Sequence, residues 1–289
     1  MPETAFVTGG TGFVGGAIVE RLVSAGRAVK ALARSDDGAH TLRALGAEPV
    51  HGDVLDARTL VDAMRGCGVL YHAAGVNAFC LGDTSPLFEV NVRGSVNAVH
   101  AAADAGVRRI VYTSSAATLG EVVSVNPASV QGPGRATGTA RLLLDYLNGR
   151  LKVVVDSTIS LIDVADCTEG HVRAEARGKP GERYVLSGAT ISVRDGIRLL
   201  ERLTGIERKV RSLPPGLALA AALAVETSAR FRRRSPPVCR ELVRTALHGH
   251  AYDGSRAARE LGLRYTPVEE TVRRTIDWFR GQGLVPTAV

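Results

Sequence analysis

Residues 4–16 constrain the fold more than any other part of this sequence. They read T-A-F-V-T-G-G-T-G-F-V-G-G, a short apolar run followed by glycines and then by apolar residues at helical spacing. Residues 4–8 are therefore predicted to form a buried parallel strand, and residues 13–22 a helix. A turn from strand to helix through glycine presents backbone N–H groups and the positive helix end with no Cβ in front of them. Such a turn suits a diphosphate.

The spacing of the glycines supports a ligand role. Glycine recurs at Gly9, Gly12 and Gly15, and Gly10, Gly12 and Gly15 also fit the pattern G-x-G-x-x-G. A tight turn can need glycine without any ligand, but here the strand, the helix and the position near the N-terminus agree. The turn is predicted to bind a dinucleotide.

Strand-like and helix-like segments then alternate. The expected strands are 28–33, 48–51, 69–73 and 107–113, and the expected helices are 38–45, 57–65 and 87–103. This alternation predicts right-handed crossovers and an α/β fold with a doubly wound parallel (Rossmann-type) sheet, with ligand at the carboxyl ends of the strands. Residues 1–130 plus about 156–178 are expected to form this domain, and about 131–155 plus 179–289 a smaller, mostly helical substrate-binding lobe.

The end of the second expected strand bears on the choice of nucleotide. An acidic residue there favours the free 2′-hydroxyl of NAD, whereas arginine favours the 2′-phosphate of NADP. Ala33 and Arg34 occupy this region, so NADP is preferred over NAD. Asp36 and Asp37 follow closely, so NAD remains an alternative cofactor.

Composition excludes several other classes. The net charge of +7 is only moderately basic and aromatic residues make up 4%, so no nucleic-acid partner is expected. The longest apolar run, residues 216–225, is shorter than the roughly 20 residues a bilayer span needs, although a basic helix near Phe231 leaves contact with a membrane surface open. The four cysteines form no C-x-x-C pair and no zinc pattern, which favours a reducing cytoplasm and no metal site.

Several short motifs together resemble one family. They are T-G-G-T-G-F-V-G at 8–15, G-D-V at 52–54, A-A-G at 73–75, N-V-R-G at 91–94 and T-S-S at 113–115. This combination resembles the extended short-chain dehydrogenase/reductase family, of the NAD-dependent epimerase/dehydratase type. The stretch N-P-A-S-V-Q-G-P-G at 126–134 is similar to its dihydroflavonol-reductase-like branch. The resemblance continues through I-D-V-A-D-C at 162–167 to S-R-A-A-R-E-L-G-L at 255–263.

The resemblance implies roles for particular residues. The residues implied at the pyrophosphate are Gly9, Gly12 and Gly15. Three further residues of this stretch are implied to bind the cofactor: Thr11, Phe13 and Val14. Arg34 is implied to bind the 2′-phosphate, and Asp53 and Val54 are implied to contact the adenine. The residues implied on the nicotinamide side are Ala73, Ala74, Gly75, Pro127 and Val130. Ser115 is implied to hydrogen-bond the reacting oxygen, the alternative being a capping serine after a strand.

One part of the family pattern is missing. The chemistry needs a tyrosine followed four residues later by a lysine, because the ammonium group lowers the phenol pKa from about 10 toward neutrality. Each of the four lysines, at 30, 152, 179 and 209, is preceded at that distance by another residue type. Tyr146 and Tyr252 have arginine at the right spacing, but glycine interrupts both segments.

The location of the gap is informative. Only residues 114–121 separate the fifth expected strand from the next one at 122–126, whereas a parallel crossover usually takes a dozen residues or more. Three explanations stay open: a binding protein that lacks the helix, an internal segment lost from the sequence, or a different proton donor. Loss of the helix is expected to leave one sheet face wet, which a homodimer could cover.

The leading expectation is an NAD(P)-dependent oxidoreductase that transfers hydride to or from a carbonyl or secondary alcohol of a small-molecule substrate. A catalytically inactive NAD(P)-sensing protein and a nucleotide-sugar epimerase or dehydratase are the alternatives.

Overall fold

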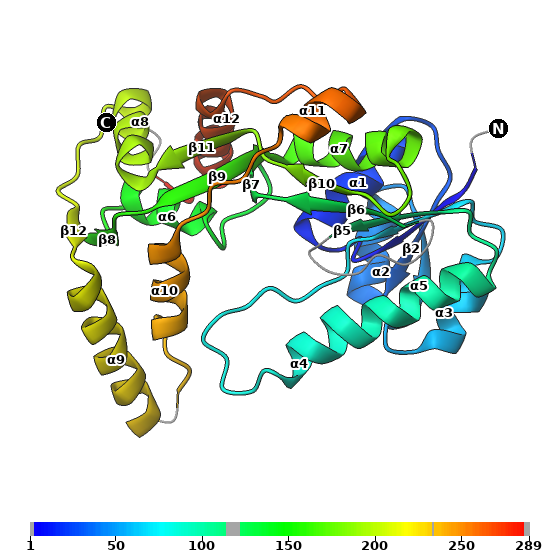
Figure 1. Cartoon of the computed structure of the whole chain (residues 1–289), viewed down its shortest axis with the longest axis horizontal. Helices are drawn as coiled ribbons and strands as arrows, with labels where there is room; N and C mark the ends of the chain where they lie inside the picture. Colours follow the sequence, from blue (N-terminus) through cyan, green and yellow to red (C-terminus); the bar gives the residue numbers. More distant parts are fainter. Residues whose placement is uncertain (1–2, 114–121, 233, 286–289) are drawn as a thin grey trace.

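The computed structural model describes residues 3–113, 122–232 and 234–285, which form two lobes (Figure 1). The larger lobe is built on a seven-stranded sheet in the order β10-β6-β5-β4-β1-β2-β3, and every neighbouring pair is parallel. Its strands are β1 (Ala5–Thr8), β2 (Val29–Ala33), β3 (Glu48–His51), β4 (Val69–His72), β5 (Arg109–Thr113), β6 (Val122–Pro127) and β10 (Arg183–Leu186). The predicted doubly wound parallel sheet is confirmed.

Helices cover both faces of this sheet. One face carries α1 (Phe13–Ser24), α2 (Asp36–Ala44), α7 (Val164–Arg177) and α11 (Ser255–Leu261). The other carries α3 (Ala57–Met64) and α5 (Ser95–Asp104). The helix predicted at 87–103 is not uniform, because α4 (Ser85–Phe88) continues into a π-helical stretch, η1 (Glu89–Gly94), before α5 begins. A Cβ on Gly94 would lie 2.7 Å from Val54 Cγ2, so glycine lets this segment approach the loop after β3.

The smaller lobe contains two small sheets and its own apolar core. The strands are β7 (Ser129–Gln131), β9 (Thr158–Asp163) and β11 (Ala189–Ser192) in the order β11-β9-β7, and the pair β8 (Val153–Val155) and β12 (Arg211–Leu213). The helices are α6 (Ala140–Leu147), α8 (Val193–Thr204), α9 (Pro215–Phe231), α10 (Arg240–His248) and α12 (Val268–Gly281). Leu144, Leu199, Ile276 and Phe279 lie in the core between α6, α8 and α12.

The lobes exchange two strands relative to the predicted division. Strand β10, from the segment assigned to the smaller lobe, pairs with β6 in the seven-stranded sheet. Strand β9, from the segment assigned to the larger lobe, pairs with β7 and β11 instead. Both strands are short, and β7 and β11 were not predicted, so sequence pattern could not show which sheet each joins.

The sheet face next to the missing crossover is covered. Val122 and Ser124 of β6 pair in register with Ile110 and Tyr112 of β5 and share their face. Their side chains are 3% and 2% exposed, respectively. The expectation of a wet face is therefore wrong at these two positions, whereas the homodimer stays a prediction.

A disulfide connects the two lobes. Cys80, in the loop after β4, is bonded to Cys239 at the start of α10, with Cα atoms 5.6 Å apart. Cys67 and Cys167 are free and buried. The Cys80–Cys239 disulfide was not predicted, because the two cysteines are 159 residues apart and only the tertiary structure brings them together.

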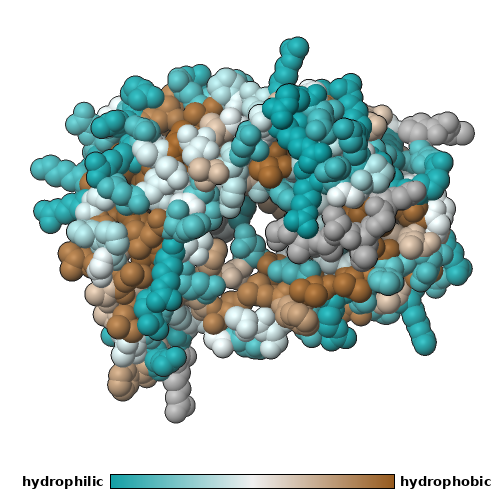
Figure 2. Space-filling model, in the orientation of Figure 1, coloured by the Kyte–Doolittle hydropathy of each residue, from teal (hydrophilic) through white to brown (hydrophobic). Residues whose placement is uncertain are grey.

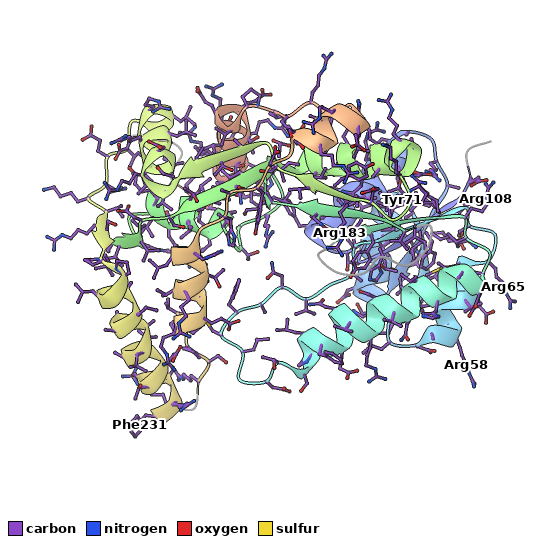
Figure 3. The ribbon with its side chains drawn as sticks, in the orientation of Figure 1. Arg58, Arg65, Tyr71, Arg108, Arg183 and Phe231 are labelled. Carbon is purple, nitrogen blue, oxygen red and sulfur yellow. A yellow bond between two sulfur atoms is a disulfide. The ribbon has the colours of Figure 1, made fainter. Side chains whose placement is uncertain are left out.

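Helices α9 and α10 form a hairpin that projects from the smaller lobe (Figure 1). Apolar surface runs along it (Figure 2), including Leu217 and Leu223, which are 61% and 47% exposed. Phe231 is 87% exposed and lies at the free end (Figure 3). Within the described residues, no helix combines the length and hydropathy needed to span a membrane.

Candidate functional site

The glycine turn after β1 is held by backbone contacts that exclude side chains. Gly9 has φ of 72°, and a Cβ there would lie 2.6 Å from backbone atoms of Ala73 and Ala74 at the end of β4. A Cβ on Gly15 would lie 2.1 Å from the carbonyl oxygen of Gly9. These two glycines are therefore required by the packing of the turn itself, with or without a ligand.

Gly12 is less constrained, since a Cβ there would lie 3.2 Å from the carbonyl oxygen of Gly9 and meet nothing else within 4 Å. Gly12 is the N-cap of α1, and no side chain caps the helix. The amides of Phe13, Val14 and Gly15 in the first turn consequently have no partner within the helix. A helix start bare of side chains suits a phosphate, whose oxygens accept hydrogen bonds from these amides.

A cavity of about 170 Å³ opens in front of this turn. It brings together eight of the predicted cofactor residues: Gly9, Thr11, Gly12, Arg34, Val54, Ala73, Ala74 and Gly75. Leu32, Val76 and Val90 complete the lining and were not predicted. Among the described residues that line the cavity, none is acidic and Arg34 is the one with a charge. The carboxyl ends of β1, β2 and β4 thus meet at one site, as expected for a parallel sheet.

The other six predicted cofactor residues lie outside this lining. Asp53 is beside it, and its Oδ1 accepts a hydrogen bond from the amide of Leu55 at 2.9 Å. The Phe13 ring lies under the guanidinium of Arg135, 5.6 Å from centroid to Cζ. Val14 packs against the core of the larger lobe, and Val130 is 7% exposed within that core.

Pro127 ends β6 and pairs in register with Leu186 of β10, and Gly15 packs against Gly9 as described above. The predicted catalytic residue Ser115 lies outside the described residues, so its position is not assigned.

A buried histidine connects the carboxyl ends of β1 and β4 to α5. His72 is 0% exposed, with Nδ1 2.7 Å from Thr8 Oγ1 and Nε2 3.0 Å from Ser95 Oγ. Ser95 Oγ donates to the carbonyl oxygen of Asn91 at 2.8 Å, so it accepts from His72 Nε2, and Nδ1 accepts from Thr8. Burial lowers the pKa of His72 to about 4. The imidazole is therefore neutral and ties β1 and β4 to α5.

Asn91 fixes the loop on the other side of the cavity. Its Oδ1 accepts from the amide of Val76 at 2.7 Å, and its Nδ2 donates to the Val76 carbonyl oxygen at 2.8 Å. In the sequence, Asn91 is recognisable only as part of the N-V-R-G motif. It lies in the π-helical stretch η1, which no local pattern predicts, and this position directs its side chain toward the loop.

The end of β5 is fixed by a second buried histidine. His171 of α7 is 0% exposed, and its Nδ1 donates to the carbonyl oxygen of Cys167 at 2.7 Å. Nε2 then accepts from Thr113 Oγ1 at 2.9 Å. Burial lowers the pKa of His171 to about 4, so it stays neutral and acts as a packed helix residue.

Neither tyrosine with a spaced arginine is poised as a proton donor. Tyr146 donates to the carbonyl oxygen of Ile206 at 2.8 Å, and burial raises its pKa to about 12. The Tyr252 hydroxyl lies 2.9 Å from Nδ1 of His250. The interruption by glycine predicted for both segments is confirmed, because neither tyrosine is followed by a continuous helix.

Comparison with known proteins supports the same family and the same fold. A model of the 3-beta hydroxysteroid dehydrogenase/isomerase family matches residues 6–129. A putative dihydroflavonol 4-reductase from Synechocystis sp. is 30% identical over 335 positions, covering 99% of this chain and 97% of that protein. The crystal structure of gox2253 has a TM-score of 0.82 at 28% identity, covering 99% of this chain and all 100% of that one. Thermus thermophilus UDP-glucose 4-epimerase in complex with NAD has a TM-score of 0.72 at 19% identity, covering 96% and 99%.

Fold and cavity together define a dinucleotide-binding protein of the Rossmann class. The chain belongs to the extended short-chain dehydrogenase/reductase family, whose members are NAD(P)-dependent oxidoreductases and epimerases. The alignment with the Synechocystis protein extends over 335 positions, whereas this chain has 289 residues. That relative therefore carries residues for which this chain has no counterpart.

Proposed function

We propose that the protein is an NADP-dependent oxidoreductase acting on a carbonyl or secondary alcohol. The observation that carries the proposal is the cavity beside a glycine turn bare of side chains, in which Arg34 is the one charged residue in the part of the chain that the structure describes. When bound, the nicotinamide would supply or accept the hydride. The backbone of Gly12 and the first turn of α1 would hold the pyrophosphate, and Ala73 to Gly75 would line the nicotinamide side.

The choice of NADP depends on the end of β2. Arg34 lines the cavity, whereas Asp36 and Asp37 begin α2 and do not. Ser35 is committed to capping α2, since its Oγ accepts from the amide of Gly38 at 3.2 Å. A 2′-phosphate beside Arg34 would gain charge-assisted hydrogen bonds that a 2′-hydroxyl would not.

Substitution of Arg34 tests this choice. Arg34→Ala is expected to weaken NADPH binding about tenfold or more while leaving NADH binding nearly unchanged, because the lost contact is to the extra phosphate. Isothermal titration calorimetry with both nucleotides measures this. Arg43→Ala, in the last turn of α2 and outside the lining, is the charge-matched control. Equal NADPH and NADH affinity in the parent protein would contradict the assignment.

A second candidate is a protein that binds the nucleotide without turnover. The observation in its favour is that no tyrosine in the sequence is followed four residues later by lysine. Both candidates bind NADPH, but only the oxidoreductase oxidises it when aldehydes or ketones are added. We retain Ser115 as the residue proposed to hydrogen-bond the reacting oxygen, with the proton donor unassigned.

A further inference from the structure

A second cavity lies inside the smaller lobe, between one face of the β11-β9-β7 sheet and the helices α6, α8 and α12. Leu161 of β9 and Ile191 of β11 line it from the sheet, and Leu143 and Leu200 line it from α6 and α8. None of the residues lining it is charged, within residues 3–113, 122–232 and 234–285. We call this cavity the apolar pocket.

Most polar groups around the apolar pocket are already paired. The Tyr146 hydroxyl donates to the Ile206 carbonyl oxygen at 2.8 Å. Ser192 caps α8, where its Oγ accepts from the amide of Asp195 at 3.0 Å and donates to Oδ2 of the same residue at 2.7 Å. These two groups are therefore not available to a ligand without loss of an existing hydrogen bond.

Gln131 is the exception. Its side chain lines the apolar pocket and is 2% exposed, and no group among the described residues donates a hydrogen bond to its Oε1. An unpaired buried acceptor is destabilising relative to a satisfied one. A ligand that donates a hydrogen bond at this point would remove this destabilisation.

The orientation of the Gln131 amide follows from its neighbours. Ser129 Oγ donates its one hydrogen to Thr139 Oγ1 at 2.7 Å, so it can only accept from Gln131. Gln131 Nε2 donates to it at 3.1 Å, which leaves the carbonyl oxygen as the free atom. The ligand group that fits is consequently a donor, such as a hydroxyl or N–H.

The polar end of the apolar pocket faces the nucleotide side of the molecule. Residues 132–138 connect Gln131 to Thr139, and within them a Cβ on Gly134 would lie 3.4 Å from the Phe13 ring. Phe13 begins α1 directly after the glycine turn. A molecule with its polar group at Gln131 therefore has that group on the side of the lobe where the proposed cofactor lies.

We propose that the apolar pocket binds the alkyl or isoprenoid part of an uncharged substrate, and that Gln131 Oε1 accepts a hydrogen bond from a hydroxyl or N–H group on it. The identification of this ligand as the substrate rests on the proposed oxidoreductase function, whereas the binding itself does not. A nucleotide sugar does not fit, because its diphosphate would lie against a lining without any cation.

The role of Gln131 is tested with two probes of equal chain length. In equilibrium dialysis, radiolabelled 1-decanol, which donates a hydrogen bond, is expected to bind about tenfold more tightly than 1-methoxydecane, which does not. In Gln131→Leu this preference should disappear, while the stability of the protein is unchanged or increased because the unpaired acceptor is gone. An equal preference for decanol in the variant would overturn the role of Gln131.

The location of the site is tested by filling it. Gly196 of α8 lines the apolar pocket, and a Cβ there would make one ordinary contact, 3.5 Å from Ile191 Cδ1. Gly196→Leu should therefore fold and weaken decanol binding at least tenfold. Gly281→Leu, at a helix end where a Cβ meets nothing within 4 Å, is the matched control and should bind decanol like the parent. Unchanged binding in Gly196→Leu would place the probe elsewhere and refute the proposal.

The two proposals fail in distinguishable ways. Failure to bind decanol, with NADPH binding intact, overturns the apolar pocket alone. Failure to bind NADPH, with decanol binding sensitive to Gly196→Leu, overturns the proposed function alone. Binding of UDP-glucose in place of decanol would favour the nucleotide-sugar alternative.

Fluorescence of Trp278, the one tryptophan, gives a second readout of decanol binding, because Trp278 packs against the same apolar cluster as Leu199 and Leu200.

Discussion

At the scale of single residues, glycines in the same turn have different reasons to be glycine. Gly9 and Gly15 leave no room for a Cβ because backbone atoms lie 2.6 and 2.1 Å from where it would be. Gly12 leaves enough room for the fold to adjust, and it lines the cavity. A substitution at Gly12 therefore reports on the ligand, whereas one at Gly9 or Gly15 reports on folding.

Gly12→Ala is expected to abolish measurable NADPH binding while the protein stays folded, because the added methyl group occupies the space where phosphate would approach the backbone. Calorimetric titration with NADPH measures the affinity, and circular dichroism the fold. Gly16→Ala is a close control: its Cβ would also lie 3.2 Å from a backbone carbonyl oxygen, that of Gly10, but Gly16 does not line the cavity. NADPH affinity in Gly12→Ala equal to that of the parent would contradict the prediction.

At the scale of elements, the strand ends are joined by buried neutral histidines. His72 links β1 and β4 to α5, and His171 links α7 to the end of β5. Both have a pKa of about 4 because burial disfavours the charged imidazole. The unfolded chain binds a proton at each position near pH 6.5. Stability is therefore complete above about pH 6.5 and is lost as the pH falls toward 4.

We expect His72→Gln to flatten this dependence. In the parent, each histidine contributes a loss of about 3 kcal/mol in the free energy of unfolding between pH 6.5 and 4. The variant has a lower free energy of unfolding at pH 7, because the hydrogen bonds at Thr8 and Ser95 change. On acidification, this free energy falls less in the variant than in the parent. Urea unfolding at several pH values measures the slope, and His40→Gln, at an exposed position, is the control. A slope in His72→Gln as steep as in the parent would count against the buried neutral imidazole.

At the scale of the whole molecule, the two lobes are joined in three ways. The chain passes from β9 in the smaller lobe to α7 and β10 in the larger lobe and then back to β11 in the smaller one. In addition, α11 packs on the larger sheet, and the Cys80–Cys239 disulfide ties the loop after β4 to α10. The disulfide crosses from the larger lobe to the smaller lobe. It therefore restricts how far the lobes can separate.

Cys239→Ser is expected to destabilise the protein by about 2–4 kcal/mol, because the bond closes a long loop in the unfolded chain. Urea unfolding measures this, and the parent protein under reducing conditions should match the variant. Alkylation after unfolding without reductant should label only Cys67 and Cys167, the two free thiols. Labelling of all four cysteines would show that the bond is absent.

Much of the larger lobe could be predicted because its signals are local. Segment 48–51 has the predicted bounds, and the resemblance to the family implied eight residues that line the cavity. The π-helical stretch, the partners of β9 and β10, and the covered face of β6 could not be predicted, because each depends on contacts between segments distant in sequence. The unpaired oxygen of Gln131 belongs to the same group, since only the packing of the lobe reveals that it lacks a donor.

The sequence alone determined the parallel sheet, the glycine turn and the absence of a Tyr-x-x-x-Lys pair. These depend on hydrophobic periodicity and on residue identity, which are properties of neighbouring positions. Only the tertiary structure decided which histidines are buried and neutral, which cysteines pair, and where an apolar cavity with one free acceptor lies. Burial and pairing are set by residues that come together from across the chain, so no local pattern encodes them.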